Sequence, residues 1–175
     1  MKGGEKVKKI AIMIVAVLSL LMVFAVVSPA LACPIQKIDF TVKSAPLSVT
    51  VVDTFTTPNG IVHTTVSFTG ILFGATGTEA SIFSGATVSG TNVEVVCSIT
   101  AQGKVMVHWT WHLAGGSFEG GFAGDVDGVG PTAALVNLHG VMLGTGDYKG
   151  WIISVEGNKP AGANPFSWTG TIVIL

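Results

Sequence analysis

Two hydrophobic patterns divide the chain into an N-terminal segment and a longer remainder. Residues 10–27 are apolar without interruption except for Ser19, which is too continuous for one face of a strand or of a surface helix. After residue 33 the apolar residues come in short β-branched and aromatic runs separated by Gly, Asn and Pro, a pattern typical of β-strands. We therefore predict a signal peptide or membrane anchor over residues 1–32 and one all-β domain over residues 33–175.

The remainder of the chain shows no long internal repeat, no charge run and no helical periodicity, so we treat it as one domain. The pattern predicts strands at about 35–42, 47–56, 61–69, 71–76, 81–88, 92–100, 104–113, 117–126, 133–143, 148–156 and 166–175.

The first predicted hairpin turns at Asn59-Gly60, the dipeptide most typical of a two-residue hairpin loop. This loop pairs Val51 with Phe68, Asp53 with Val66, and Phe55 with Thr64. Asp53 then lies on an otherwise apolar face, where it is either a buried general acid or base or a rim residue in water. We favour the rim, because only Phe55 separates Asp53 from the end of the strand.

Two further hairpins predict one apolar face shared by three strands. A three-residue loop at Ala101-Gln102-Gly103 pairs Val93 with Trp111, Val95 with Trp109, Cys97 with Val107, and Ile99 with Val105. A turn at Gly115-Gly116 pairs Leu113 with Phe118, Trp111 with Gly120, Trp109 with Phe122, and Val107 with Gly124. Large rings opposite glycines suit a strongly curved sheet. We therefore predict a small, antiparallel, glycine-rich β-barrel, with a β-sandwich as the alternative.

The segment at residues 139–151 reads His-Gly-Val-Met-Leu-Gly-Thr-Gly-Asp-Tyr-Lys-Gly-Trp. It resembles the Gly-Thr-Gly-Asp-aromatic-x-Gly hairpin of small secreted barrels of the allene oxide cyclase and dirigent-like group, and residues 167–172 fit a last strand of that kind. The resemblance covers about the final third of the chain. It implies an eight-stranded antiparallel barrel with a central cavity for a ligand. No catalytic residue of that group matches a residue here.

The N-terminus has the pattern of an export signal. Lys residues precede the apolar run 10–27, and Ala30-Leu31-Ala32 provides the small-x-small sequence that a signal peptidase cleaves. We expect cleavage after Ala32, with retention of the run as a transmembrane anchor as the second outcome. Lipid attachment at Cys33 is the third. In each case the domain is exported, to the cell envelope or beyond it.

The charge of the chain excludes one large class of partner. The nine basic residues are all Lys. Without residues 1–32, five Lys remain against nine acidic residues, a net charge of −4. We therefore expect no nucleic-acid partner, and the sequence predicts no cofactor.

Cysteine usage leaves two possibilities open. Cys33 and Cys97 both fall in the exported part, where an oxidising compartment permits a disulfide between them. Alternatively, Cys97 is a small hydrophobe on the predicted apolar face. A lipid on Cys33 is incompatible with the disulfide.

A group of His and Glu residues is the candidate for metal or proton chemistry. His108 and His112 lie about 13 Å apart on one strand at ~3.3 Å per residue, too far to share a metal ion on their own. The predicted register places Glu119 opposite His112 and Glu94 diagonal to both histidines. The four residues would hold a proton-transfer pair or one divalent ion. The alternative, which we favour, is an exposed His–Glu pair with little effect on stability.

No catalytic or phosphate-binding motif is present in the sequence. We therefore expect a non-catalytic domain that binds a small apolar ligand inside the barrel. The predicted lining residues are Trp109, Trp111, Phe118 and Phe122. The alternatives are a structural or surface-interaction domain with a filled core, and an isomerase- or cyclase-like enzyme that uses the cavity.

Overall fold

Eight antiparallel β-strands carry the fold in the computed structural model, which describes residues 35–162 and 165–174. The strands are β1 (Gln36–Thr56), β2 (Ile61–Gly77), β3 (Thr87–Cys97), β4 (Gln102–Leu113), β5 (Gly116–Asp127), β6 (Ala134–Gly146), β7 (Trp151–Lys159) and β8 (Phe166–Ile174). Two short 3-10 helices, η1 (Ala80–Phe83) and η2 (Gly130–Thr132), lie between strands. The described part of the chain is therefore all-β, as the sequence predicts.

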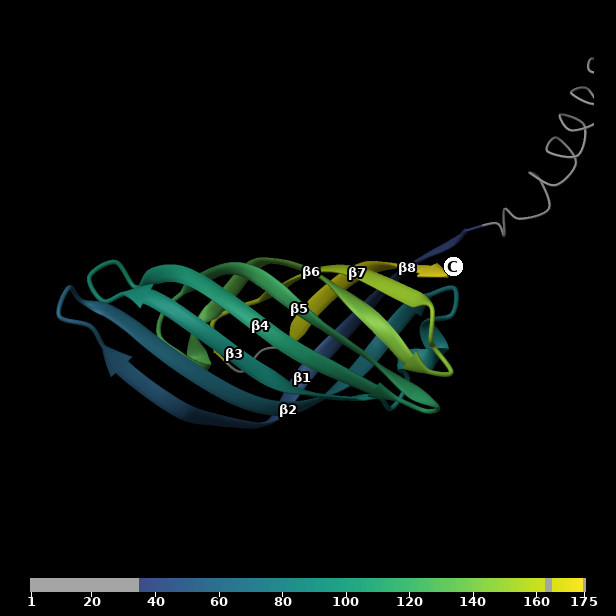
Figure 1. Ribbon diagram of the computed structural model, residues 1–175, viewed down its shortest axis with the longest axis horizontal. Helices are drawn as coiled ribbons and strands as arrows, with labels where there is room; N and C mark the ends of the chain where they lie inside the picture. The colour runs from purple at the N-terminus through teal and green to yellow at the C-terminus, as the bar shows by residue number, and fades with distance from the viewer. Residues whose placement is uncertain (1–34, 163–164, 175) are drawn as a thin grey trace, which may run out of the picture. The chain divides into compact units, whose positions relative to one another are not determined.

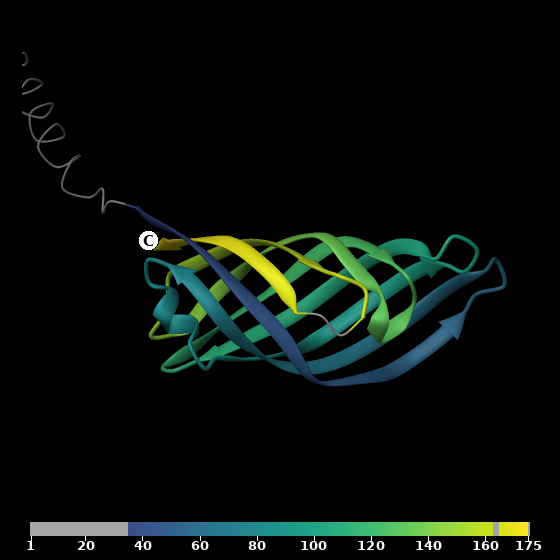
Figure 2. The same cartoon turned by 180° about the vertical axis from the view of Figure 1, so that it is seen from behind.

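The strands form one closed sheet. Each strand pairs with the next along the chain, and β8 pairs back onto β1, so the ribbon encircles a common interior (Figures 1 and 2). This closed antiparallel sheet confirms the predicted barrel over the sandwich. Because odd-numbered strands run one way and even-numbered strands the other, η1 and η2 lie at opposite ends of the barrel.

The predicted signal or anchor, the cleavage position after Ala32 and the candidate lipid attachment at Cys33 lie outside the described residues and stay predictions. Within the described residues, no helix is long and apolar enough to cross a membrane.

Aromatic rings fill the interior of the barrel. Trp109 lies fully buried, with the ring centroid of Trp168 at 5.0 Å. Its neighbours across the sheet are Gly90 on β3 and Gly120 on β5. A Cβ added at Gly90 would lie 2.6 Å from the Trp109 ring. Glycine opposite a large ring therefore provides the space that the sequence pattern predicts.

The predicted register of β3 on β4 is wrong by five residues. Glu94 pairs with Val105, and Val96 pairs with Gly103. The connection is longer than predicted because the backbone N–H of Ala101 donates to the carbonyl of Cys97 at 2.8 Å, and Ala101 adopts a left-handed φ of 56°. This slip turns Val93, Val95 and Cys97 outward, leaves Ile99 exposed on the loop, and turns Asn92 and Glu94 into the interior.

The predicted register of β4 on β5 is wrong by two residues. Trp111 pairs with Phe118, and Trp109 pairs with Gly120, because the turn centres on Ala114 and Gly115, where Gly115 has a φ of 88°. A slip of two residues preserves which side chains face inward. The predicted apolar face on these two strands is therefore confirmed.

The register of β1 on β2 also differs from the prediction, because β1 contains bulges at Leu47 and Val52. The bulge at Val52 moves Asp53 to the outer face, where it pairs with Thr65 and is exposed. The prediction that Asp53 shares an apolar face is therefore wrong.

Part of β1 has a strand neighbour on one side only. β8 pairs with β1 over residues 36–44, whereas residues 45–56 pair with β2 and with no other described strand. We call residues 45–56 the free edge; Figures 1 and 2 show it running lengthwise along the lower side of the barrel toward the β1–β2 turn. Its exposed large hydrophobic residues are Leu47, Val49, Val51, Val52 and Phe55.

Candidate functional site

A cavity of about 190 Å³ lies at the end of the barrel that holds η2. We call it the mouth cavity. Its apolar wall includes Val49, Val66, Phe68, Trp109, Leu135 and Phe166. Three polar side chains, Asn92, Glu94 and Lys159, also line it. An apolar cavity with a few convergent polar groups is the usual form of a small-molecule site.

Glu94 is the acidic group of the mouth cavity. The register of β3 on β4 points it inward, and only 2% of its surface is exposed. The backbone N–H of Gly130 donates to its Oε2 at 3.1 Å. Burial raises the pKa of the Glu94 carboxyl, while the Gly130 hydrogen bond and the charge of Lys159 oppose this rise. The carboxyl is therefore biased toward its protonated form.

Lys159 is the basic group and ends β7. It is 7% exposed, and its Nζ donates to the carbonyls of Ala133 at 2.5 Å and Pro131 at 3.0 Å. Burial lowers the pKa of the Lys159 amine, while the negative charge of Glu94 opposes this decrease. Both members of the pair are thus pushed toward their neutral forms.

The pair also fixes η2 across the barrel end. Glu94 accepts from the first residue of η2, and Lys159 donates to Pro131 within it. Because every one of these bonds ends on a backbone group, the segment keeps its place without a large apolar side chain of its own.

Asn92 completes the polar part of the cavity. Its Oδ1 accepts a hydrogen bond from the indole Nε1 of Trp109 at 2.9 Å. The amide N–H groups of Asn92 have no protein partner among the described residues, so they remain available to a hydrogen-bond acceptor in the cavity.

Only one of the predicted ligand-lining residues borders the mouth cavity. Trp109 lines it, whereas Trp111, Phe118 and Phe122 are packed in the core. The indole Nε1 of Trp111 is buried without a hydrogen-bond partner in the described part; its ring meets Phe83 edge to face at 5.7 Å.

The predicted His and Glu cluster does not assemble. Glu94 lies inside the barrel, because the five-residue slip of β3 reverses its face. His108 and Glu119 form an exposed pair at 3.6 Å, while His112 bonds Ser89 at 2.8 Å. Within the described residues, no three His, Cys, Asp or Glu side chains gather in a group able to hold a metal ion. An exposed His–Glu pair is therefore present, but its histidine is His108 and not the predicted His112, because the register places Glu119 opposite Thr110.

Cys97 lies half-buried at the end of β3 and forms no disulfide within the described residues. Hydrogen bonds from the backbone of Thr100 and Ile99 lower the pKa of this thiol. Its predicted disulfide partner, Cys33, lies outside the described residues, so the disulfide stays a prediction.

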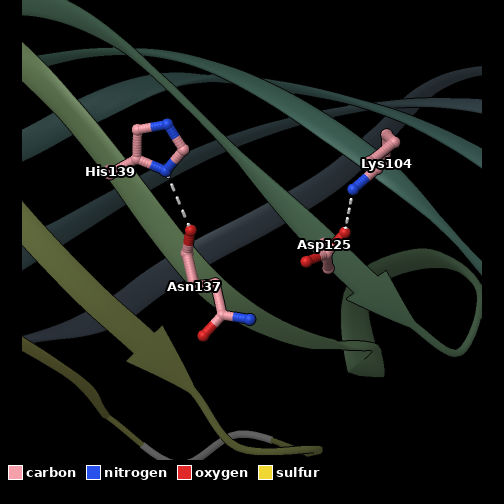
Figure 3. A network of polar contacts seen from close by, with 4 residues as sticks. All are labelled: Lys104, Asp125, Asn137 and His139. Atoms are coloured by element: carbon pink, nitrogen blue, oxygen red, sulfur yellow. Dashed lines mark hydrogen bonds and ion pairs between the residues drawn. The ribbon is translucent and has the colours of Figure 1, made fainter.

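A second polar cluster lies on the outer surface (Figure 3). Lys104 forms an ion pair with Asp125. The hydrogen bond from Lys104 Nζ to Asp125 Oδ1 is the main cause of the lowered pKa of Asp125. His139 Nδ1 lies 3.2 Å from the carbonyl oxygen of Asn137, which has a left-handed φ of 51°. Lys104 and His139 are exposed to water, so this cluster lacks the burial that sets the mouth cavity apart.

Sequence reasoning missed two of the three polar residues of the cavity. Lys159 follows Ile153, Val155 and Gly157 at a period of two, so strict alternation along β7 indicates that it faces inward. Asn92 alternates in the same way with Glu94 and with the buried Val96. Both signals were present in the sequence, but polar residues at inward positions oppose the general expectation of an apolar interior.

A solved structure with a similar fold is a protein of unknown function of the DUF3224 family from Shewanella oneidensis MR-1. It shares 14% sequence identity with this chain at a TM-score of 0.50, and the alignment covers 81% of this chain and 98% of that chain. At this identity the likeness concerns the fold alone. No protein-family model and no curated protein matches the chain. The resemblance to the allene oxide cyclase and dirigent-like group stays a prediction.

Proposed function

We propose that the domain binds a small, mainly apolar molecule in the mouth cavity. The observation that supports this proposal is a cavity with aromatic walls into which a buried acid and a buried amine converge. A volume of about 190 Å³ is below the usual range for drug-sized ligands, which starts at about 300 Å³. The ligand is therefore a compact molecule with one polar group, and the domain acts on it outside the cytoplasm.

Hexanol tests this proposal, with the indole N–H signals of the tryptophans in an NMR spectrum as the readout. We expect hexanol to shift the Trp109 signal, since Trp109 lines the cavity, and to leave the Trp111 signal in place. Hexylamine and hexanoate have the same tail and a charged head, so they measure the preference for a neutral head.

A matched pair of variants locates the binding. Val49 lines the cavity and Val141 lies on the outside of β6, and both side chains are partly exposed. We expect Val49→Phe to weaken hexanol binding and Val141→Phe to leave it unchanged. Equal shifts of all four tryptophan signals, or equal affinity in the two variants, would refute a site in the mouth cavity.

The free edge supports a second candidate function, self-association. It exposes unpaired backbone groups together with large apolar side chains, the combination that favours pairing with another strand. A second copy fits, because a two-fold axis at Val51 pairs the edge with itself in antiparallel fashion. In that pairing the single charged residue of the edge, Asp53, faces Val49 and not another acid. Sedimentation at increasing protein concentration tests this candidate.

A further inference from the structure

We propose that the ligand of the mouth cavity is a small apolar aldehyde or ketone, and that the Nζ of Lys159 captures its carbonyl carbon as an imine. This inference rests on the proposed function, because the same cavity must first admit the molecule. It adds a covalent step and a chemical class of ligand to that function.

The hydrogen bonds of Lys159 suit a neutral amine. An uncharged amine has two N–H bonds and one lone pair, and Nζ has two acceptors in the structure, the carbonyls of Pro131 and Ala133. Both N–H bonds are thereby used, and the lone pair stays free for an electrophile. The burial that favours the uncharged form also keeps bulk water away from the imine.

Lys159 is distinct from the other lysines of the barrel. Lys37, Lys43, Lys104 and Lys149 are all exposed, and none of them lines the mouth cavity. Lys159 is buried beside apolar walls that attract an apolar carbonyl compound. Selectivity among the lysines is therefore the main consequence of the proposal.

The first step forms the carbon–nitrogen bond. The lone pair of Nζ attacks the carbonyl carbon, and the π electrons of the C=O bond move to oxygen. That oxygen takes the proton of the Glu94 carboxyl, and the amide N–H of Asn92, which also lines the cavity, donates to it during the attack. The nitrogen then returns one proton to the Glu94 carboxylate, leaving a neutral carbinolamine.

The second step releases water. Glu94 protonates the hydroxyl, the carbon–oxygen bond breaks as water leaves, and the lone pair of Nζ forms the C=N bond. The last proton on nitrogen returns to Glu94, which ends as it began. Overall, one amine and one carbonyl compound give one imine and one water, and no oxidant or reductant is consumed.

The test is reductive trapping of the whole protein with hexanal and sodium cyanoborohydride, followed by peptide mass mapping. Cyanoborohydride supplies the hydride that makes an imine permanent. We expect Lys159 to be modified at least ~10-fold faster than any of the four exposed lysines, and we expect excess hexanol to slow that modification selectively. The exposed lysines are internal controls, so this comparison requires no variant to fold.

Two outcomes would overturn the imine. The first is modification of the exposed lysines with Lys159 unmodified, and the second is modification of Lys159 at the rate of its exposed counterparts. If hexanol still shifts the Trp109 signal in either case, binding in the cavity stands and only the covalent step fails.

A variant tests the role of Glu94 in proton transfer. We expect Glu94→Gln to slow trapping at Lys159 by ~10²-fold, the lower end for general acid–base catalysis, with a preserved tryptophan spectrum as evidence that the fold is intact. Glu119→Gln, on the outer face, is the matched control and should have no effect. An unchanged rate in folded Glu94→Gln would remove Glu94 from the mechanism.

Discussion

The two ends of the barrel are closed in opposite ways. At one end, η1 inserts Phe83, which is fully buried against Phe40 with ring centroids 4.7 Å apart. At the other end, η2 contributes no large side chain and is held by hydrogen bonds to Glu94 and Lys159. We call Phe83 the plug and the Glu94 and Lys159 side chains the clamp. Each closes one end of the same barrel, the plug by apolar packing and the clamp by hydrogen bonds.

The difference between the two ends shows that only the η2 end carries the cost of burying polar groups. An apolar plug gains free energy from burial alone, whereas two buried polar groups must offset the loss of their hydration. Apolar residues of similar volume would close the second end at least as well. We therefore interpret the clamp as the functional end of the barrel and the plug as its structural end.

Removal of the plug gives the largest expected effect. We expect Phe83→Ala to lower the free energy of unfolding by about 3–5 kcal/mol, the usual cost of truncating a fully buried Phe, as measured by urea denaturation. Ile99→Ala, at a side chain that is 90% exposed, should change it by less than about 0.5 kcal/mol. Equal effects of the two substitutions would contradict the assignment of Phe83 as a stabilising plug.

Removal of one member of the clamp comes next. We expect Lys159→Met to cost about 3 kcal/mol, because it leaves the carbonyls of Pro131 and Ala133 without their buried hydrogen-bond donor. The double variant Glu94→Leu/Lys159→Met should cost less than the sum of the two single changes, since neither buried group is then left without the other. Additive costs in a double-mutant cycle would show that the two groups do not interact.

The pH dependence of stability separates the two ends further. Because the pKa of Glu94 is raised on folding, its contribution to stability is complete in acid below the usual Glu range and is lost as the pH rises through the raised value. The lowered pKa of Lys159 has the opposite sign on the alkaline side, where stability increases as the pH rises toward the usual Lys range.

Urea denaturation from acidic to neutral pH measures this effect. We expect Glu94→Gln to remove the decline in stability that Glu94 causes, while Phe83→Ala lowers stability equally at every pH. Glu119→Gln, which makes the same change at an exposed carboxyl, is the control. A decline that persists in Glu94→Gln would assign it to another group.

The smallest effect on stability is expected at the free edge. Val52 is 62% exposed, so Val52→Lys should change the free energy of unfolding by less than about 0.5 kcal/mol. It should nevertheless abolish self-association in sedimentation experiments, because a lysine on an edge strand opposes pairing. Val141→Lys, on a strand that is paired on both sides, should leave association unchanged. Dimers that persist in Val52→Lys would exclude the free edge as the interface.

The fold was predictable from the sequence because alternation and turn residues act locally. Trp109, Trp111, Phe118 and Phe122 were all placed on one face, and all are buried. The strand registers were less predictable from the sequence, since they depend on the conformation of each turn. The left-handed residue in the β3–β4 loop is Ala101, and nothing about an alanine distinguishes that conformation in advance.

The site was less predictable than the fold for the same reason. The sequence indicates Glu94 as a candidate, but the predicted register of β3 on β4 is five residues off and puts Glu94 on the outer face with the wrong partners. Lys159 comes from a strand four positions away in the ring, and only closure of the sheet and the insertion of η2 bring it to the same cavity. A site assembled by tertiary contacts of this kind leaves only the period-two pattern of each strand in the sequence.

The pairing of β1 with β8 has a further consequence for engineering. Gln36 lies directly across the ladder from Ile174, so the two ends of the closed sheet are neighbours. A circular permutant, with a short linker across this pair and new ends between Asn59 and Gly60, keeps all eight strand pairings. In that molecule the free edge becomes the C-terminal end of the chain, which allows residues 50–56 to be removed one at a time while Val49 and the rest of the mouth-cavity wall are retained.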